Sequence, residues 1–238
     1  MRVGVVGDIH APFTHPLYRQ FCQDVFESWN INSTMFIGDI VDNHAISFHD
    51  NETSGLGAEQ EADLALAEVD KWKELWPKAK VCVGNHDALH YRKCAKGGLP
   101  VRFVQEYSQV WNTPKWNWAL QHEIDGVKYV HGTGLSGKYA AINHAVSQGQ
   151  SVVMGHIHTA GYVIMHTNPA GRISGTQTGC GIDIDAYAFE YAKVFKDRCI
   201  LGCAVVIDGI SYFEPMPCSP KEKYHKSRAG KFRRKELI

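Results

Sequence analysis

Four short apolar segments of this 238-residue chain each end in a glycine that is followed by aspartate, asparagine or histidine, and a fifth ends in histidine and then glycine. The five stretches are Val5–His10, Phe36–Asp42, Val83–Asp87, Tyr129–Gly132 and Val153–His158. A single stretch of this kind can be no more than a turn between a strand and a helix. Five of them indicate buried strands whose polar ends converge, as the strand ends of a layered α/β fold do. We therefore expect these side chains to form one site.

The segments between these stretches predict the elements that join them. Apolar residues at helical spacing predict helices over residues 17–29, 58–76, 103–111 and 139–146. Short apolar runs predict strands over residues 2–7, 34–37, 81–83, 127–130 and 151–154, with several more between 160 and 215. Asp208-Gly209 is a hairpin signal within that last region, and residues 43–57 have no clear period and are interpreted as a loop or lid. The order, βαβαβ first and mainly β later, predicts a layered α/β fold with helices outside a central sheet assembly, which two packed sheets would satisfy.

Length and composition favour one large domain. The apolar content of 44% and the charged content of 21% are ordinary for a globular protein. The chain has no run of about 18 apolar residues and opens directly on a strand-like segment, so we expect neither a membrane span nor a signal peptide. The seven cysteines have no CxxC spacing and lie in apolar contexts, which is typical of reduced thiols in a cytoplasmic protein.

Charge is unevenly distributed along the chain. The segment 221–238 carries eight basic and two acidic residues, which leaves the rest of the chain with a formal charge of −6. We divide the sequence into a domain over residues 1–218 and a basic tail over 219–238. An acidic body suits a metal centre built from carboxylates, whereas the tail is either a solvated terminus or a contact for nucleic acid or another polyanion.

The polar residues at the strand ends form a ligand set of oxygen and imidazole donors without thiolate. Its members are Asp8, His10, Asp39, Asn85, His131, His156 and His158. Such donors suit manganese, iron, zinc or cobalt better than a structural zinc site of the cysteine type. Seven ligands are too many for one tetrahedral ion and about right for two ions that share a carboxylate. Two ions ~3.5–4 Å apart serve in-line attack on phosphorus.

In order along the chain, the motifs Asp-x-His, Gly-Asp-x-x-Asp, Gly-Asn-His-Asp, His-Gly and Gly-His-x-His resemble those of the calcineurin-like metallophosphoesterase superfamily. The match extends over residues 5–158, about two thirds of the chain. The resemblance implies a central β-sandwich of two mixed sheets flanked by helices, and hydrolysis of phosphate esters.

The resemblance also implies a role for each site residue. One ion would be held by Asp8, His10, Asp39 and His158, and the second by Asp39, Asn85, His131 and His156, with a hydroxide between the ions as nucleophile. Manganese is favoured over iron, zinc, cobalt or nickel. His86 would be the proton donor to the leaving oxygen, with Asp42 as its orienting carboxylate. Asp87 would be structural, either supporting the ligands or capping the helix that follows.

The sequence departs from the protein-phosphatase branch after Gly-Asp-x-x-Asp, where that branch has a phosphate-gripping arginine and this chain has Asn43 and then His44. Losing that bidentate clamp disfavours a Ser/Thr phosphatase and favours phosphodiesters. Candidate substrate contacts are Asn43, His44 and His49, with Lys138, His144 and Arg172 as weaker ones. Two alternatives stay open. One is a DNA exo- or endonuclease of the repair branch, with nucleotide or nucleic acid as substrate, and the other is a non-catalytic scaffold that binds a partner through its tail.

Overall fold

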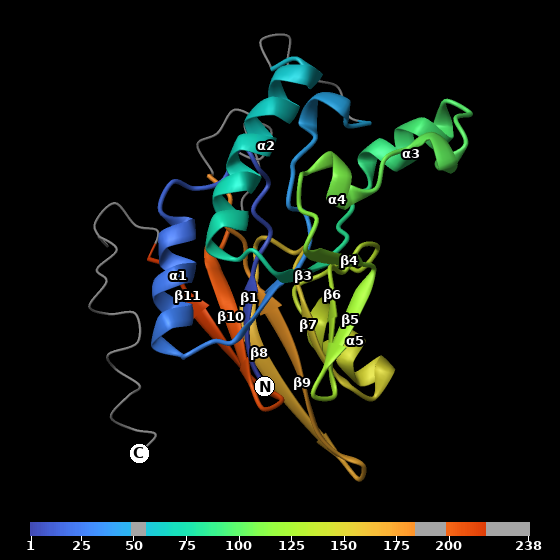
Figure 1. Ribbon diagram of the computed structural model, residues 1–238. Coiled ribbons are helices and arrows are strands. Elements are labelled where there is room, and N and C mark those ends of the chain that lie inside the picture. Colours follow the sequence, from blue (N-terminus) through green and yellow to red (C-terminus); the bar gives the residue numbers. More distant parts are fainter. Residues whose placement is uncertain (49–55, 184–198, 218–238) are drawn as a thin grey trace.

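Two mixed β-sheets lie at the centre of the computed structural model, which describes residues 1–48, 56–183 and 199–217 (Figure 1). The first sheet has the order β11-β10-β1-β2-β3-β4, in which β1 to β4 run parallel and β10 is antiparallel to both of its neighbours, β1 and β11. Its strands are β1 (Arg2–Val6), β2 (Ser33–Phe36), β3 (Ala79–Cys82), β4 (Trp116–Ala119), β10 (Gly202–Ile207) and β11 (Ile210–Pro215).

The second sheet has the order β5-β6-β7-β9-β8. Its central strands β6, β7 and β9 are parallel, and the two edge strands β5 and β8 are antiparallel to their neighbours. The strands are β5 (Gln121–Ile124), β6 (Val127–Val130), β7 (Ser151–Met154), β8 (Gly161–Asn168) and β9 (Gly171–Thr178).

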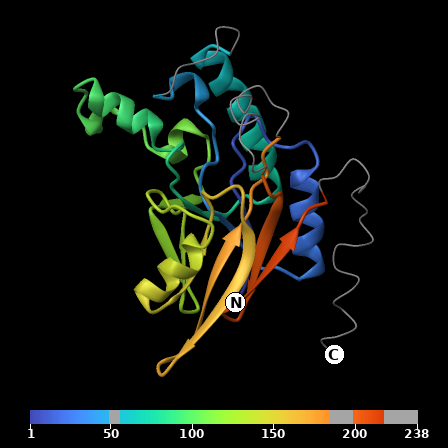
Figure 2. The same cartoon turned by 180° about the vertical axis from the view of Figure 1, so that it is seen from behind.

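Helices cover the outer faces of the two sheets and make four layers. α1 (Tyr18–Ser28) and α2 (Ala58–Leu75) lie on one side of the sandwich, and α5 (Ala140–Gln148) lies on the other (Figures 1 and 2). Successive residues of β1 point to opposite faces. Val5 belongs to the core between the sheets, and Val6 belongs to the core under α1 and α2. The strand is continuously apolar because both of its faces are buried, and the predicted fold class is confirmed.

The region between the third strand and β4 differs from the predicted helix over 103–111. The structure has α3 (Leu89–Lys96), a 3₁₀ turn η2 (Val101–Phe103) and a short α4 (Tyr107–Val110). Phe103 is 67% exposed, so it is not part of a buried helix face. Leu89 is the one buried residue of α3, and the helix therefore has no apolar stripe that its sequence could reveal.

The predicted hairpin at Asp208-Gly209 is confirmed, because Ile207 pairs with Ile210 and both turn residues have positive φ (48° and 83°). In the described part of residues 43–57, η1 (His44–Ile46) follows Asp42. The tail over 219–238 and the rest of the predicted lid (49–55) lie outside the described residues.

The six cysteines that the structure describes are free thiols. None of the described helices is long and apolar enough to cross a membrane.

Candidate metal centre

The ligand candidates meet at the carboxyl ends of five parallel strands from both sheets. β1 leads into Asp8 and His10, and β2 into Asp39. β3 leads into Asn85, β6 into His131, and β7 into His156 and His158. The ends of β1, β2 and β3 in the first sheet meet those of β6 and β7 in the second, and Asp8 and His158, 150 positions apart, are thereby placed in contact.

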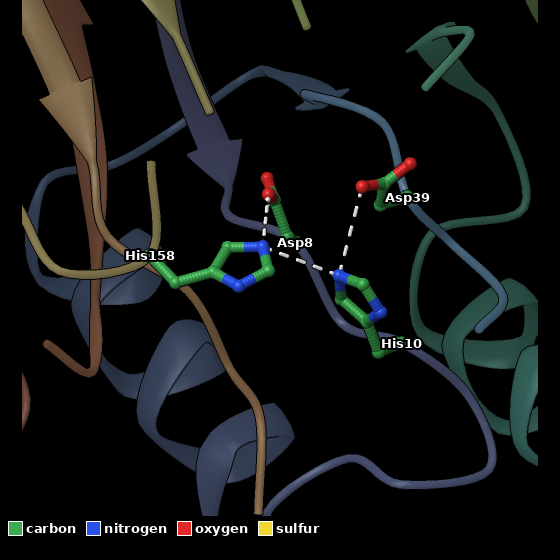
Figure 3. A group of neighbouring side chains, drawn as sticks. All are labelled: Asp8, His10, Asp39 and His158. Atoms are coloured by element: carbon green, nitrogen blue, oxygen red, sulfur yellow. Dashed lines mark hydrogen bonds and ion pairs between the residues drawn. The ribbon is translucent and has the colours of Figure 1, made fainter. Parts of the chain in front are cut away.

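The first donor group contains Asp8, His10, Asp39 and His158, whose ligand atoms all lie within 4.8 Å of one another (Figure 3). His158 Nε2 lies 3.0 Å from Asp8 Oδ2 and 3.3 Å from His10 Nε2. His10 Nε2 is in turn 3.6 Å from Asp39 Oδ2. Two imidazole nitrogens that face each other need a proton or a cation between them, because two lone pairs repel.

Asp8 supplies a direct indication that this group suits a cation. Its Oδ2 accepts hydrogen bonds from the His156 N–H (2.8 Å) and from the imidazole of His158. Its Oδ1 is buried and has no hydrogen-bond partner among the described residues. A buried carboxylate oxygen without a partner is costly, and a hard divalent ion would satisfy it.

The second donor group contains Asp39, His131 and His156. His131 Nε2 lies 3.1 Å from Asp39 Oδ2 and 3.1 Å from the side-chain oxygen of Asn85. On the other side of the ring, Nδ1 lies 3.2 Å from the carbonyl of Ile37. A proton on Nδ1 donates to that carbonyl and leaves the Nε2 lone pair facing the site, which is how histidine ligands are usually oriented. Asp39 belongs to both groups.

Buried carboxylates dominate the electrostatics of the two donor groups, and positive charge nearby stabilises their ionised form. Burial favours the neutral form of Asp39, but the imidazoles of His131 and His86 hold the pKa of its carboxyl well below the usual range. Burial opposes protonation of His131, yet Asp39 and Asp8 raise its pKa to about 9. Positive charge at this position is therefore favoured by the two carboxylates.

Asp42 lies beside His10 and His86, in addition to His44. Its Oδ1 lies 2.6 Å from His10 Nδ1, on the side of the ring opposite to the ligand nitrogen. His86 Nδ1 lies 2.5 Å from the backbone oxygen of Asp42 and 3.6 Å from Oδ1. The Asp42 carboxylate therefore orients mainly His10, whereas the Asp42 main-chain carbonyl orients His86. The sequence-based prediction of Asp42 as the partner of His86 had not included this bond to His10.

His86 lies at the partly exposed side of the site. Its side chain is 26% exposed, similar to the 22% of His158, whereas those of His10 and His131 are each 1% exposed. Burial lowers the pKa of His86, but Asp39 and Asp42 outweigh it and the pKa is raised. The imidazole therefore lies at the boundary between the donor groups and solvent, where a leaving group can reach it.

Asp87 joins the two loops that carry Asp39 and Asn85. Its Oδ1 accepts from the N–H groups of Ile40 (2.9 Å) and Val41 (3.3 Å), and its Oδ2 accepts from Gly84 N–H (2.9 Å). α3 begins two residues later with no side-chain cap, so the helix-capping alternative is wrong. Burial raises the pKa of this carboxyl to about 7.

Asp87→Asn is expected to lower the free energy of unfolding of the metal-free protein by about 2 kcal/mol. In the variant, the side-chain NH₂ group would replace one carboxylate oxygen and would face a backbone N–H that donates to that oxygen in the wild type. This buried backbone N–H would therefore lose its acceptor. For a chain of this size, the melting temperature should fall by about 4–8 °C. Asp63→Asn, on the exposed face of α2, is the control and should stay within about 0.5 kcal/mol. Equal melting temperatures would contradict the bracing role of Asp87.

Gly84 provides space for Asp39. A Cβ at position 84 would overlap Asp39 Oδ1 and the Asp39 backbone nitrogen. The backbone of Gly84 is not in the positive-φ region, so the residue is needed for a close approach rather than for an unusual turn. Gly155 leaves room for Asp8 Oδ1 in the same way.

Gly84→Ala is expected to reduce the metal content of the purified protein, because the new methyl group must displace the Asp39 carboxylate. The measurement is metal per chain by inductively coupled plasma mass spectrometry after dialysis against Mn²⁺. Gly57→Ala is the matched control, since a Cβ there meets no atom within 4 Å. An unchanged metal content in Gly84→Ala would show that the carboxylate position is not critical.

The predicted substrate residues have mixed outcomes. Asn43 lies at the site with a left-handed backbone (φ 52°), and its Nδ2 donates to the His86 carbonyl at 3.0 Å. His44 Nδ1 lies 4.0 Å from Asp42 Oδ2. Within the described structure, Lys138, His144 and Arg172 make no hydrogen bond or ion pair with the ligand residues. His49 lies outside the described residues.

Glu61 was missed by the sequence analysis. Its carboxylate accepts from the backbone N–H groups of His44 (2.6 Å) and Ala45 (2.7 Å), and it is 3% exposed. It therefore fixes the loop after Asp42. The available signal was its position four residues before Ala65 on the apolar stripe of α2, where a charged residue needs a partner.

The sequence model described as "Calcineurin-like phosphoesterase" matches residues 1–136. The chain belongs to this family. The matched region holds the first four of the five polar motifs and both residues of the His86–Asp42 contact. No curated protein matches the chain.

Solved structures with a similar fold have low sequence identity to the chain. Vps29 from Chaetomium thermophilum has a TM-score of 0.46 at 12% identity, over 93% of this chain and 91% of that one. The phosphoesterase YfcE from E. coli has a TM-score of 0.43 at 12% identity, over 87% and 88%. The nuclease MPE from Pseudomonas putida has a TM-score of 0.39 at 12% identity, over 90% and 85%.

Proposed function

We propose that the chain hydrolyses phosphodiesters at a centre of two divalent ions, with manganese favoured. The observation that supports this most is that the two donor groups share Asp39, whose Oδ2 lies 3.6 Å from His10 Nε2 and 3.1 Å from His131 Nε2. When bound, two ions in such a site polarise the phosphoryl oxygens and activate water for in-line attack.

The residues divide between the two ion positions. Asp8, His10 and His158 would hold the first ion, and Asn85, His131 and His156 the second, with Asp39 shared. Buried partners orient these ligands: the Asp42 carboxylate holds His10 Nδ1 and the Ile37 carbonyl faces His131 Nδ1. Such partners raise ligand basicity and fix the ring.

His86 is the proposed proton donor to the leaving oxygen. Its Nδ1 proton is held by the Asp42 carbonyl, so the proton that is transferred is the one on Nε2. The ring is partly exposed beside both donor groups, which gives a leaving group access to it. A positioned imidazole of this kind typically contributes a factor of about 10²–10⁴ to the rate.

The preference for diesters rests on Asn43, which stands where the protein-phosphatase branch has arginine. A guanidinium can bind the two free oxygens of a monoester dianion in bidentate fashion, whereas the Asn43 amide already donates to the His86 carbonyl. A singly charged diester does not need that clamp.

The test compares bis(p-nitrophenyl) phosphate with p-nitrophenyl phosphate in the presence of Mn²⁺. We expect the diester to have the higher kcat/KM. A higher kcat/KM for the monoester would contradict the diester preference. Two bound ions with no turnover of either ester would favour a non-catalytic scaffold instead.

A further inference from the structure

Three cationic side chains converge on one aromatic ring beside the candidate metal centre. The Arg92 guanidinium lies 5.2 Å from the centroid of the Phe48 ring, the Lys93 ammonium 4.3 Å and the Lys96 ammonium 4.9 Å. We call these three residues of α3 the basic cluster. None of them forms an ion pair with a carboxylate in the described parts of the chain, so no negative charge there offsets their mutual repulsion, and the ring stabilises them through cation–π contacts. Such a concentration of charge is suited to bind an anion.

The basic cluster lies close to the donor groups. Lys93 Nζ donates to the Ser47 carbonyl at 2.9 Å, and Ser47 directly follows η1, which begins two residues after Asp42. Along the other segment, Arg92 comes six residues after His86. α3 begins three residues after His86. The cluster is therefore connected both to the segment that carries Asp42 and to the segment that carries His86.

Aromatic contacts hold α3 against the body of the protein. The Tyr91 ring lies 4.9 Å from that of Tyr107, which stacks on Trp118 of β4 at 5.2 Å. His90 adds an edge contact to Tyr107 at 5.1 Å. The far end of α3 projects away from the sheets (Figures 1 and 2). The cluster thus has a fixed position relative to the donor groups while its outer surface stays accessible.

The segment that follows α3 continues the same combination of charge and aromatic surface. The Arg102 guanidinium lies 5.8 Å from the ring centroid of Phe103, and Phe103 is 67% exposed. Leu99 and Val101 beside it are also exposed. Exposed aromatic rings next to cations form the surface on which successive bases stack in single-stranded nucleic acid.

We propose that the basic cluster and the Phe103 segment (Leu99, Val101, Arg102 and Phe103) bind a single-stranded polynucleotide, and that this polymer is the substrate of the metal centre. Its role as substrate rests on the proposed phosphodiester hydrolysis. A small diester has one negative charge and cannot use four neighbouring cations, whereas a polynucleotide repeats a phosphodiester at every nucleotide. One phosphodiester can lie at the donor groups while others along the same strand contact the cluster.

The test measures fluorescence anisotropy of labelled (dT)₂₀ and (U)₂₀ with the full chain and no added metal. The variant is Arg92→Ala/Lys93→Ala/Lys96→Ala. The matched control is Lys78→Ala/Lys80→Ala/Lys115→Ala, which removes the same charge from the start of β3 and the residues just before β3 and β4, at the opposite end of the strands. We expect the α3 variant to weaken binding at least about 10-fold and to reduce the slope of log K against log[salt] by about 2, because each contact to single strands contributes about 0.7. The control should stay within about twofold.

A second variant guards against misfolding. Arg92→Ala/Lys96→Ala keeps the Lys93 bond to Ser47 and should reduce the salt slope by about 1.4. Comparison of (dT)₂₀ with (U)₂₀ distinguishes DNA from RNA as the preferred polymer. Equal oligonucleotide affinities in the wild type, the α3 variants and the control would overturn the proposal. Binding to phosphatidylserine vesicles that depends on the cluster, without oligonucleotide binding, would also overturn it.

Failure of this inference is distinguishable from failure of the proposed function. Turnover of bis(p-nitrophenyl) phosphate without cluster-dependent oligonucleotide binding would leave the hydrolase intact and remove the polynucleotide surface. Cluster-dependent oligonucleotide binding without turnover of the small diester would leave the surface intact and remove the hydrolase.

Discussion

Replacing Asp39 with asparagine is expected to abolish metal-dependent turnover, lowering kcat/KM by at least about 1000-fold, or about 4 kcal/mol of transition-state stabilisation. Asp39 is the one residue that belongs to both donor groups, and its Oδ2 faces the ligand nitrogens of His10 and His131. An amide is a weaker ligand than a carboxylate, and its NH₂ end repels cations. The measurement is kcat/KM for the diester together with metal per chain.

Asp24→Asn is the matched control for this prediction. Asp24 is a buried carboxylate on α1, outside the donor groups, and accepts a hydrogen bond from Gln20. We expect its metal content and turnover to match those of the wild type. If Asp39→Asn retained two ions per chain and wild-type turnover, a shared carboxylate would not be the basis of the site.

Replacing His86 with alanine is expected to leave the metal content intact and to lower turnover of diesters with poor leaving groups by about 10²–10⁴-fold. The ring is proposed to donate a proton and not to bind metal, and a good leaving group needs little protonation. Turnover of a dinitrophenyl ester should therefore fall much less than turnover of a phenyl or alkyl ester. The measurement is kcat across a series of leaving groups, with metal per chain determined on the same samples.

His122→Ala is the control, since this histidine lies on β5 and contacts backbone carbonyls of Val81 and Asn117. Two results would contradict the role given to His86. The first is loss of metal from His86→Ala, which would make His86 a ligand. The second is an equal loss of rate for good and poor leaving groups, which would indicate a role other than proton donation.

The strand-end motifs predicted the location of the site because their signal is local. A short apolar run, a glycine and a polar residue are adjacent in sequence, and the parallel strand order brings their ends together. Asp8 and Asp39 illustrate this, since they follow the parallel neighbours β1 and β2 and belong to the same donor group.

Roles that depend on contacts between loops could not be predicted in the same way. Asp87 was predicted to be structural, but its acceptance of hydrogen bonds from the backbone of Ile40 and Val41, 47 and 46 residues away, could not be read from the sequence. The Asp42 carboxylate was expected to orient His86, yet it also lies 2.6 Å from His10 Nδ1. The space that Gly84 leaves for Asp39 is likewise visible only once two loops are placed together.

α3 was missed for a different reason. Most of its side chains are not buried, so the apolar periodicity that reveals α1 and α2 is absent. In the sequence alone, its arginine and lysine residues cannot be distinguished from ordinary surface residues. Only the structure shows that three of them share the Phe48 ring.

The central claim is that both donor groups together hold two ions that share Asp39. Electron paramagnetic resonance during titration with Mn²⁺ tests it most directly, because two manganese ions that share a carboxylate are magnetically coupled and two distant ions are not. We predict a coupled-pair spectrum at two equivalents of Mn²⁺ per chain, and its absence in Asp39→Asn. A six-line signal of isolated ions that grows in proportion to Mn²⁺ up to two bound equivalents would contradict the shared site.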